Sequence, residues 1–172
     1  MKIFMFNKKI IYLILAAVFV VLAVFSYSQS RQAKKEKNVS PEQELMTLKV
    51  YFNNDKLDPE FSCYKVFPVE RKVGKKTAVA RAAIEELLKG PTEEEKAAGF
   101  FTSINTGVKI QKLVVENGTA KVDFDKQMEY QMGGSCRVSA IRSQITETLK
   151  QFSTVKNVII SVDGRTEDIL QP

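Results

Sequence analysis

Alternating apolar and polar positions predict five strands in the part of the chain that follows residue 46. The segments that alternate, or that carry runs of β-branched and aromatic residues, are 48–52, 63–73, 108–116, 119–125 and 155–162. Pro68 cannot donate to a sheet ladder, so it places part of the second strand at an edge or a bulge. Asn117-Gly118 predicts a type I′ hairpin turn between the third and fourth strands. The apolar centre of the last strand predicts an interior position in its sheet.

Apolar residues at helical spacing predict two amphipathic helices, over residues 77–89 and from Gly133 to about Phe152. Thr77 is the expected cap of the first helix, which Gly90-Pro91 ends, and Ser135 is the expected N-cap of the second. The expected core positions on the two helices are Ala80, Ile84, Leu87 and Leu88, and then Val138, Ile141, Ile145, Leu149 and Phe152.

Between these helices, Thr92 and Glu95 have the spacing of a capping box for a short helical turn. Helices that each carry one apolar stripe need an apolar sheet face to cover. The sequence therefore predicts an α+β fold, a two-layer sandwich in which two main helices cover one face of a mixed, mostly antiparallel sheet. Four aromatic residues are interpreted as core rather than as a stacking platform, namely Tyr51, Phe52, Tyr64 and Phe67.

The first part of the chain has a different pattern. Residues 10–25 form an apolar run without a charge, behind a basic tip over residues 1–9. This layout is typical of an export signal, and we predict a retained signal anchor over residues 10–27, with a cleaved signal as the alternative. Residues 28–45 are polar and basic and predict a flexible linker. We therefore expect a single-pass protein of the bacterial cell membrane whose domain, residues 46–172, lies outside the cytoplasm.

Charge and composition exclude several functions. The net charge of +6 is concentrated near the start, and from residue 46 onward there are 19 basic and 17 acidic residues. A domain so balanced gives no support to nucleic-acid binding. The chain has no His, which excludes Ser-His-Asp and Cys-His catalysis and His-ligated zinc. No nucleotide loop or metal-ligand spacing is present, so we expect no cofactor and no metal.

Cys63 and Cys136 are the two cysteines of the chain. An even number of cysteines in an exported domain favours a disulfide between them. The alternatives are two free thiols, or one reactive thiol and a second thiol that takes no part in the chemistry. Cys136 lies at a predicted helix start, where the helix dipole lowers the pKa of a thiol.

Three groups of residues are candidates for chemistry or binding. Asp123 and Asp125, two apart on a strand, with Glu129 following, could act as acid and base or bind a cation. A polar outer face at the strand end is the favoured interpretation, since no third ligand or base is evident. Arg71, Lys72, Lys75 and Lys76 form a basic cluster that could contact an anionic wall polymer or a partner. Gly133, Gly134 and Ser135 precede a helix, where free backbone N–H groups can hold an anion.

The order and spacing of several motifs resemble the GerMN domain family of sporulation and spore-germination proteins. The motifs are VYFNN, FPVERKV, ARAAIEELLKGPTEEE, GVKIQKLVVENGTAKVDF, GGS before AIRSQITETLKQF, and VKNVIISVDG, which together span residues 47–168. The resemblance implies an exported, anchored, non-enzymatic module related to the ring-building motifs of envelope complexes. It departs from the sporulation protein in having one copy of the module and a membrane segment as its anchor.

The function predicted from the sequence is therefore a membrane-anchored, extracytoplasmic, non-catalytic module that docks an envelope protein or self-associates. One alternative is a module that binds peptidoglycan or an anionic wall polymer through the basic cluster. The other is an enzyme acting on peptidoglycan through Asp123, Asp125 or Glu129, for which two carboxyls must face each other across a cleft.

Overall fold

The computed structural model describes residues 17–28, 44–75 and 78–171. The chain divides into residues 1–43 and a compact unit from Glu44 to Pro172. In the first unit, residues 17–28 form a helix without a charged residue. Within the described residues no helix is both long and apolar enough to cross a membrane. The rest of the expected anchor, residues 10–16, and most of the expected linker, residues 29–43, lie outside the described residues.

The first sheet of the compact unit is built on a long central strand. β1 (Leu45–Asn54) pairs antiparallel with β2 (Phe67–Gly74) and, at its far end, with β3 (Phe100–Phe101), in the order β2-β1-β3. Alternate residues of β1 point into the core, so that Leu48, Val50 and Phe52 are fully buried.

The second sheet contains β4 (Ile110–Glu116), β5 (Thr119–Phe124) and β6 (Asn157–Val162) in the order β4-β5-β6. β4 and β5 are antiparallel, whereas β5 and β6 are parallel. Asn117 and Gly118 have φ values of 48° and 77°, so the turn between β4 and β5 has the positive φ at both central residues that a type I′ turn requires. The predicted hairpin is confirmed.

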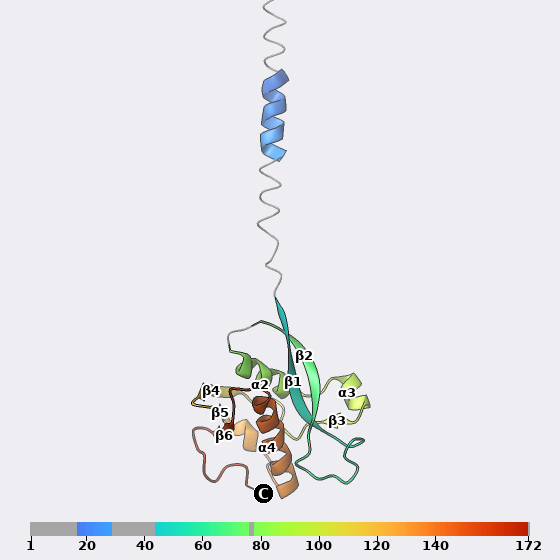
Figure 1. The fold of residues 1–172 in the computed structure, drawn as a ribbon, viewed down its shortest axis with the longest axis vertical. Coiled ribbons are helices and arrows are strands. Elements are labelled where there is room, and N and C mark those ends of the chain that lie inside the picture. The colour runs from blue at the N-terminus through green and yellow to red at the C-terminus, as the bar shows by residue number, and fades with distance from the viewer. Residues whose placement is uncertain (1–16, 29–43, 76–77, 172) are drawn as a thin grey trace, which may run out of the picture. The chain divides into compact units, whose positions relative to one another are not determined.

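Two main helices connect the sheets (Figure 1). α2 (Val79–Leu88) contacts β1 and β4, α4 (Ser135–Lys150) contacts β1 and β6, and the two helices pack on each other. The predicted core positions Ala80, Ile84 and Leu87 on α2 and Val138, Ile141, Ile145 and Leu149 on α4 are all buried. The other two predicted core residues, Leu88 and Phe152, are partly buried against the same core. Two short elements complete the unit, α3 (Glu93–Ala97) and the 3-10 turn η1 (Lys126–Glu129). The predicted capping box of α3 is present, with Thr92 and Glu95 bonded reciprocally.

The α+β class is confirmed, and several details differ from the expectation. The strands form two three-stranded sheets rather than one: β1 pairs with β2 and, at Asn53 and Asn54, with β3, whereas β5 pairs with β4 and β6. β6 lies at an edge rather than in the interior; its apolar centre is explained by α4, which covers one face. The N-cap of α4 is Gly134 rather than Ser135, so no side chain caps the start of this helix. Thr77, the expected cap of α2, lies outside the described residues.

Candidate functional site

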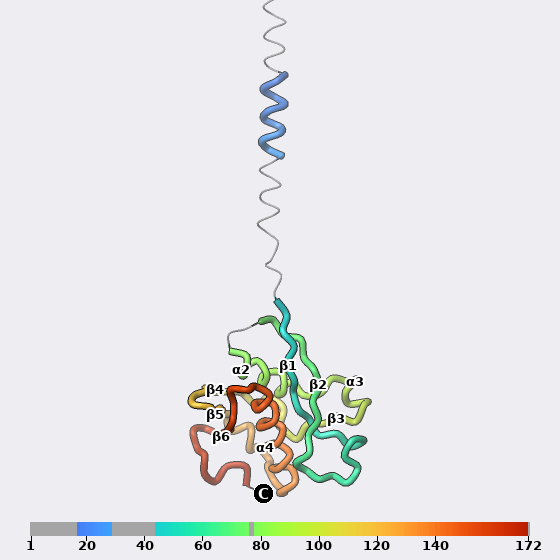
Figure 2. The backbone as a smooth tube through the Cα atoms, in the orientation of Figure 1, coloured from blue at the N-terminus to red at the C-terminus, as the bar shows by residue number. Residues whose placement is uncertain are grey.

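The loop between β1 and β2, residues 55–66, is joined to the start of α4 by a disulfide. Cys63 and Cys136 are bonded, with their Cα atoms 5.0 Å apart across a sequence separation of 73. Figure 2 shows the loop at the far end of β1 and β2, next to the first turn of α4. Residue 63 was predicted to lie within the second strand, but Cys63 has a φ of 61°, which is incompatible with extended backbone, and β2 begins only at Phe67.

Side chains of β1 and of the loop itself hold the shape of the loop. Asn53, which is 5% exposed, donates through Nδ2 to the backbone oxygens of Cys63 at 3.0 Å and Lys65 at 2.9 Å. Asp58 accepts bonds from the backbone N of Ser62 at 2.9 Å and from its Oγ at 2.6 Å. The Ser62 hydroxyl lowers the pKa of the Asp58 carboxyl below its ordinary value. The loop is thus fixed by polar contacts as well as by the disulfide.

This loop and the start of α4 enclose an open pocket of about 440 Å³. Its lining is mostly apolar and includes Phe61, Phe101 and the disulfide. Gly133 and Gly134 also line the pocket, and a Cβ added at either would meet no atom within 4 Å. The predicted glycine pair therefore lies at a hollow in the surface, although this hollow is mainly apolar rather than an evident anion site.

Large apolar side chains stand out from the same loop. Leu57, Phe61 and Tyr64 are 54%, 60% and 68% exposed. The interpretation of Tyr64 as a core residue was wrong, because the residues from Lys56 to Val66 do not continue the strand that would have buried it. Exposed aromatic residues beside a concave apolar surface are typical of sites where another molecule binds.

The basic cluster is less free to contact an anion than the sequence predicted. The Arg71 guanidinium makes two bonds to the Glu95 carboxylate, one of them Nη2 to Oε2 at 2.6 Å, and the Arg71 side chain is 13% exposed. This hydrogen bond from Arg71 lowers the pKa of Glu95 below its ordinary value. Arg71 is therefore engaged inside the domain and is not a free anion contact. Lys75 pairs with Glu44, Lys72 is exposed, and Lys76 lies outside the described residues.

The acidic candidates are all engaged in structural contacts. Asp123 accepts from Oγ of Ser161 at 2.6 Å and from the backbone N of Gly164 at 2.9 Å. β5 ends at Phe124, so Asp125 does not share a strand face with Asp123 as expected; it accepts from the backbone N of Lys109 at 3.1 Å.

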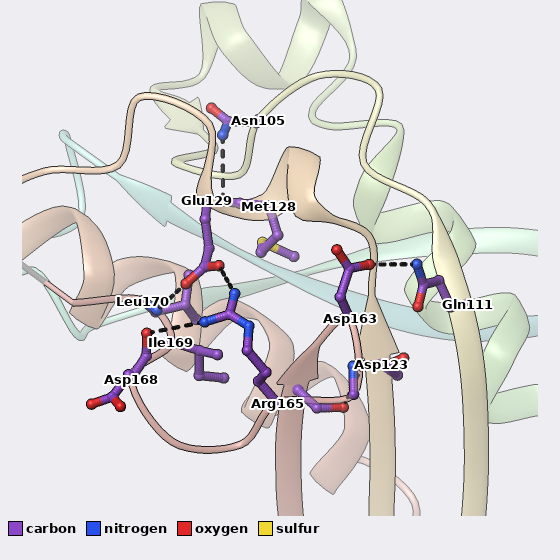
Figure 3. Close-up of polar contacts among 12 residues, drawn as sticks. Asn105, Gln111, Asp123, Met128, Glu129, Asp163, Arg165, Asp168, Ile169 and Leu170 are labelled. Carbon is purple, nitrogen blue, oxygen red and sulfur yellow. Dashed lines mark hydrogen bonds and ion pairs between the residues drawn. The ribbon is translucent and has the colours of Figure 1, made fainter.

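Glu129 fixes the segment that follows β6. Its carboxylate accepts from Nη2 of Arg165 at 2.5 Å and from the backbone N of Leu170 at 2.9 Å, as Figure 3 shows. The contacts of Asp123, Asp125 and Glu129 each tie two parts of the fold together, and this explains the three carboxylates without catalysis.

The residues that sequence reasoning missed are Asn53, Phe61 and Gln144. Asn53 follows the apolar segment 50–52 and is itself followed by Asn54 and Asp55, so the sequence at this strand end contains no local signal that its side chain is buried. Phe61 was assigned to no element, and Gln144 lies between core positions of the second helix, where a buried polar side chain requires partners.

The family to which the chain belongs follows from comparison with known proteins. The family model described as "Germane: Sporulation and spore germination" matches residues 49–168. This range contains the elements from β2 to β6 and most of β1, and with them the capping box and the hairpin described above. The chain belongs to this family of sporulation and spore-germination domains.

Solved structures agree with this assignment. The tandem GerMN domains of the sporulation protein GerM from Bacillus subtilis align with a TM-score of 0.56 and 25% identity, over 76% of this chain and 43% of that chain. The first GerMN domain of the same protein aligns with a TM-score of 0.53 and 21% identity, over 70% of this chain and 85% of that one. This chain thus spans less than half of the tandem-domain structure. No curated protein matched.

Proposed function

We propose that this chain is a non-catalytic module on the outer side of a bacterial cell membrane, where it binds a protein partner of the envelope during sporulation or germination. The observation that carries the proposal is the disulfide-held loop, which exposes Leu57, Phe61 and Tyr64 and whose Phe61 lines an apolar pocket. Apolar side chains held in place before binding lose little conformational entropy when a partner covers them, which favours a specific contact.

Two features support the location. A disulfide between Cys63 and Cys136 persists in an oxidising compartment such as the space outside the cell membrane. The helix over residues 17–28 overlaps the uncharged apolar run over residues 10–25. Such a run behind a basic tip is typical of an export signal, and in this proposal the signal is retained as the membrane anchor. Membership of the sporulation and germination family fits the same location.

The contacts of the acidic residues favour binding over catalysis. A glycoside hydrolase of the common kind needs one carboxyl free to donate a proton and another to activate water or attack the sugar. Asp123, Asp125 and Glu129 instead accept bonds that join neighbouring parts of the fold. Arg71, the centre of the basic cluster, is bonded to Glu95, which reduces the support for binding of a wall polymer there.

Photo-crosslinking in intact cells tests the proposal. A photoreactive amino acid replaces Tyr64 in the full chain, and a second variant carries it at Val115, which is 38% exposed on β4. We expect one protein adduct from position 64, identified by mass spectrometry, none of comparable yield from position 115, and loss of the adduct when Phe61→Ser is added. Equal yields from both positions, or an adduct with wall polymer instead of protein, would refute the proposal.

A further inference from the structure

The two sheets end in strands whose edges differ in their protection against pairing with another chain. β2 carries Pro68 and a run of charged residues, and β4 carries a bulge between Ile110 and Lys112. These are the features by which natural proteins prevent edge-to-edge association. β3 is only two residues long. β6, with the sequence NVIISV, has no charge and no proline, and its pairing with β5 has no register shift.

The free backbone groups of β6 are identified by its bonds to β5. The N–H of Asn157 donates to Gly118 and that of Asp163 donates to Phe124. In a parallel ladder, alternate residues face the neighbouring strand, so the N–H and C=O groups of Val158, Ile160 and Val162 point to the other side. The groups of Val162 are already bonded within the chain: its N–H donates to the backbone oxygen of Arg165 and its C=O accepts from the backbone N of Arg165, both at 3.0 Å. In the described chain, Val158 and Ile160 make no comparable contact at this edge.

We infer that β6 pairs with β6 of a second copy of this chain, antiparallel and about a two-fold axis. The free groups determine the register. If Val158 of each copy lies opposite Ile160 of the other, all of the free N–H and C=O groups are paired, because each such pair exchanges two bonds. A register that places Val158 opposite Val162 would meet groups that Arg165 already occupies. A second copy is thus a complementary partner for this edge.

The side chain at the centre of the edge agrees with this register. Ile159 is 42% exposed, whereas its strand neighbours Val158 and Ile160 are half-buried and buried. In the inferred pair it lies opposite Ile159 of the second copy, at a non-hydrogen-bonded position where opposite Cα atoms are about 4.5 Å apart. The apolar contact removes the most exposed large side chain of β6 from water.

Such an edge contact is small, because standard stable interfaces bury upwards of about 1,200 Å². It would be strengthened where two copies share one membrane, since confinement raises their effective concentration. The inference goes beyond the partner-binding role proposed above and uses a surface distinct from the loop over residues 55–66, so each can fail without the other.

Disulfide crosslinking of the full chain in its membrane tests the inference. Ile159→Cys places the new thiols within the Cα distance that a disulfide spans, and Cys63 and Cys136 are already bonded to each other. The matched control is Asn157→Cys, which is also exposed on β6 but would lie about 13 Å from its counterpart in this register. We expect mild oxidation to give a dimer of this chain at least about tenfold more efficiently from position 159 than from position 157.

A second pair of variants measures association without crosslinking. Ile159→Lys places two like charges opposite each other and should abolish energy transfer between fluorescently labelled full chains in lipid vesicles, whereas Val115→Lys on β4 should leave it unchanged. Equal crosslinking at positions 157 and 159, no dimer from position 159, or a crosslink from position 159 to a different protein would each overturn the inference. The Tyr64 adduct of the previous experiment should persist in Ile159→Lys, which separates this result from the proposed function.

Discussion

Gln144 on α4 donates a hydrogen bond from Nε2 to Oδ1 of Asn53 on β1, at 2.7 Å, and both side chains are buried. Gln144 Oε1 in turn accepts from Oγ1 of Thr102 at 2.7 Å. Since Asn53 also holds the backbone of Cys63 and Lys65, the core of the domain is connected through one amide pair to the loop that exposes the aromatic residues.

Gln144→Leu should therefore destabilise the domain although it makes the core more apolar. The substitution leaves Oδ1 of Asn53 buried without its donor, at a cost of about 1–3 kcal/mol. Urea unfolding of the full chain, followed by circular dichroism, measures the loss. Glu147→Leu, the same replacement type at an exposed position of α4, should change stability by less than ~0.5 kcal/mol. Equal stability of the wild type and Gln144→Leu would mean that the amide pair contributes nothing.

The sequence was sufficient to predict those parts of the fold that local chemistry determines. The Asn117-Gly118 turn, the Thr92–Glu95 capping box and the core stripes of α2 and α4 depend on residues close in sequence, and all were confirmed. The family was also identified from motif order and was confirmed.

The sequence could not predict features that depend on contacts between distant segments. The third strand of the first sheet is defined by the pairing of Asn53 and Asn54 with Phe101 and Phe100, and β3 is too short to have a pattern of its own. The last residues of the loop after β1, from Cys63 to Val66, resemble the start of a strand in sequence, yet Cys63 adopts a positive φ. Ion pairing of Arg71 with Glu95, 24 positions apart, likewise has no local signal.

Gly99→Ala should be destabilising because of a steric clash. Gly99 has a φ of 95°, and a Cβ there would lie 3.0 Å from Oδ1 of Asn54, which is buried and held by bonds from the backbone N atoms of Lys56 and Leu57. Gly107→Ala is the matched control, since Gly107 has a φ of 85° and a Cβ there meets nothing within 4 Å. Both variants lose about 1 kcal/mol from backbone strain, and only Gly99→Ala should lose a further ~1–3 kcal/mol. Thermal unfolding that gives the same midpoint for both would contradict the close approach at Gly99.

Glu95→Gln should destabilise the domain in a way that depends on pH. Gln keeps the capping box with Thr92 but loses the charge that pairs with Arg71, so we expect a loss of ~1 kcal/mol at neutral pH. The pKa of Glu95 is lowered in the folded state from an ordinary value of 4.5. Its contribution is therefore complete above that value and is lost as the pH falls through the lowered pKa.

The difference in unfolding free energy between wild type and Glu95→Gln should thus shrink in acid, which urea titrations from neutral to acidic pH can measure. Glu93→Gln is the control, because Glu93 pairs with Lys96 while 85% exposed and should show little difference at any pH. A Glu95→Gln difference that is constant down to the lowest pH would contradict the ion pair as its source.

Removal of the disulfide should destabilise the domain and release the loop. In the chain-entropy model, a loop closed across a separation of 73 residues is worth roughly 4 kcal/mol. We expect the variant with Cys63→Ser and Cys136→Ser to unfold at much lower urea concentration, and amide hydrogen exchange in residues 55–66 to accelerate more than in β5. Thiol labelling of wild-type protein taken directly from cells should modify neither cysteine without reductant. Labelling of both would contradict the bond.

Asp123→Asn combined with Asp125→Asn should leave partner binding intact, provided that the domain folds. Each Asn retains an amide oxygen that can accept the backbone N–H of Gly164 or Lys109, so the expected loss of stability is only about 1–2 kcal/mol. The carboxylates are removed as acid, base or nucleophile, while the exposed loop with Phe61 and Tyr64 is unchanged. The yield of the photo-adduct from position 64 in intact cells is the measurement, with melting of the purified full chain as the control for folding. A double variant that melts normally and still gives the adduct, yet loses the associated sporulation or germination phenotype, would show that these carboxylates act in something other than partner binding. That result would favour an enzyme acting on peptidoglycan over a binding module.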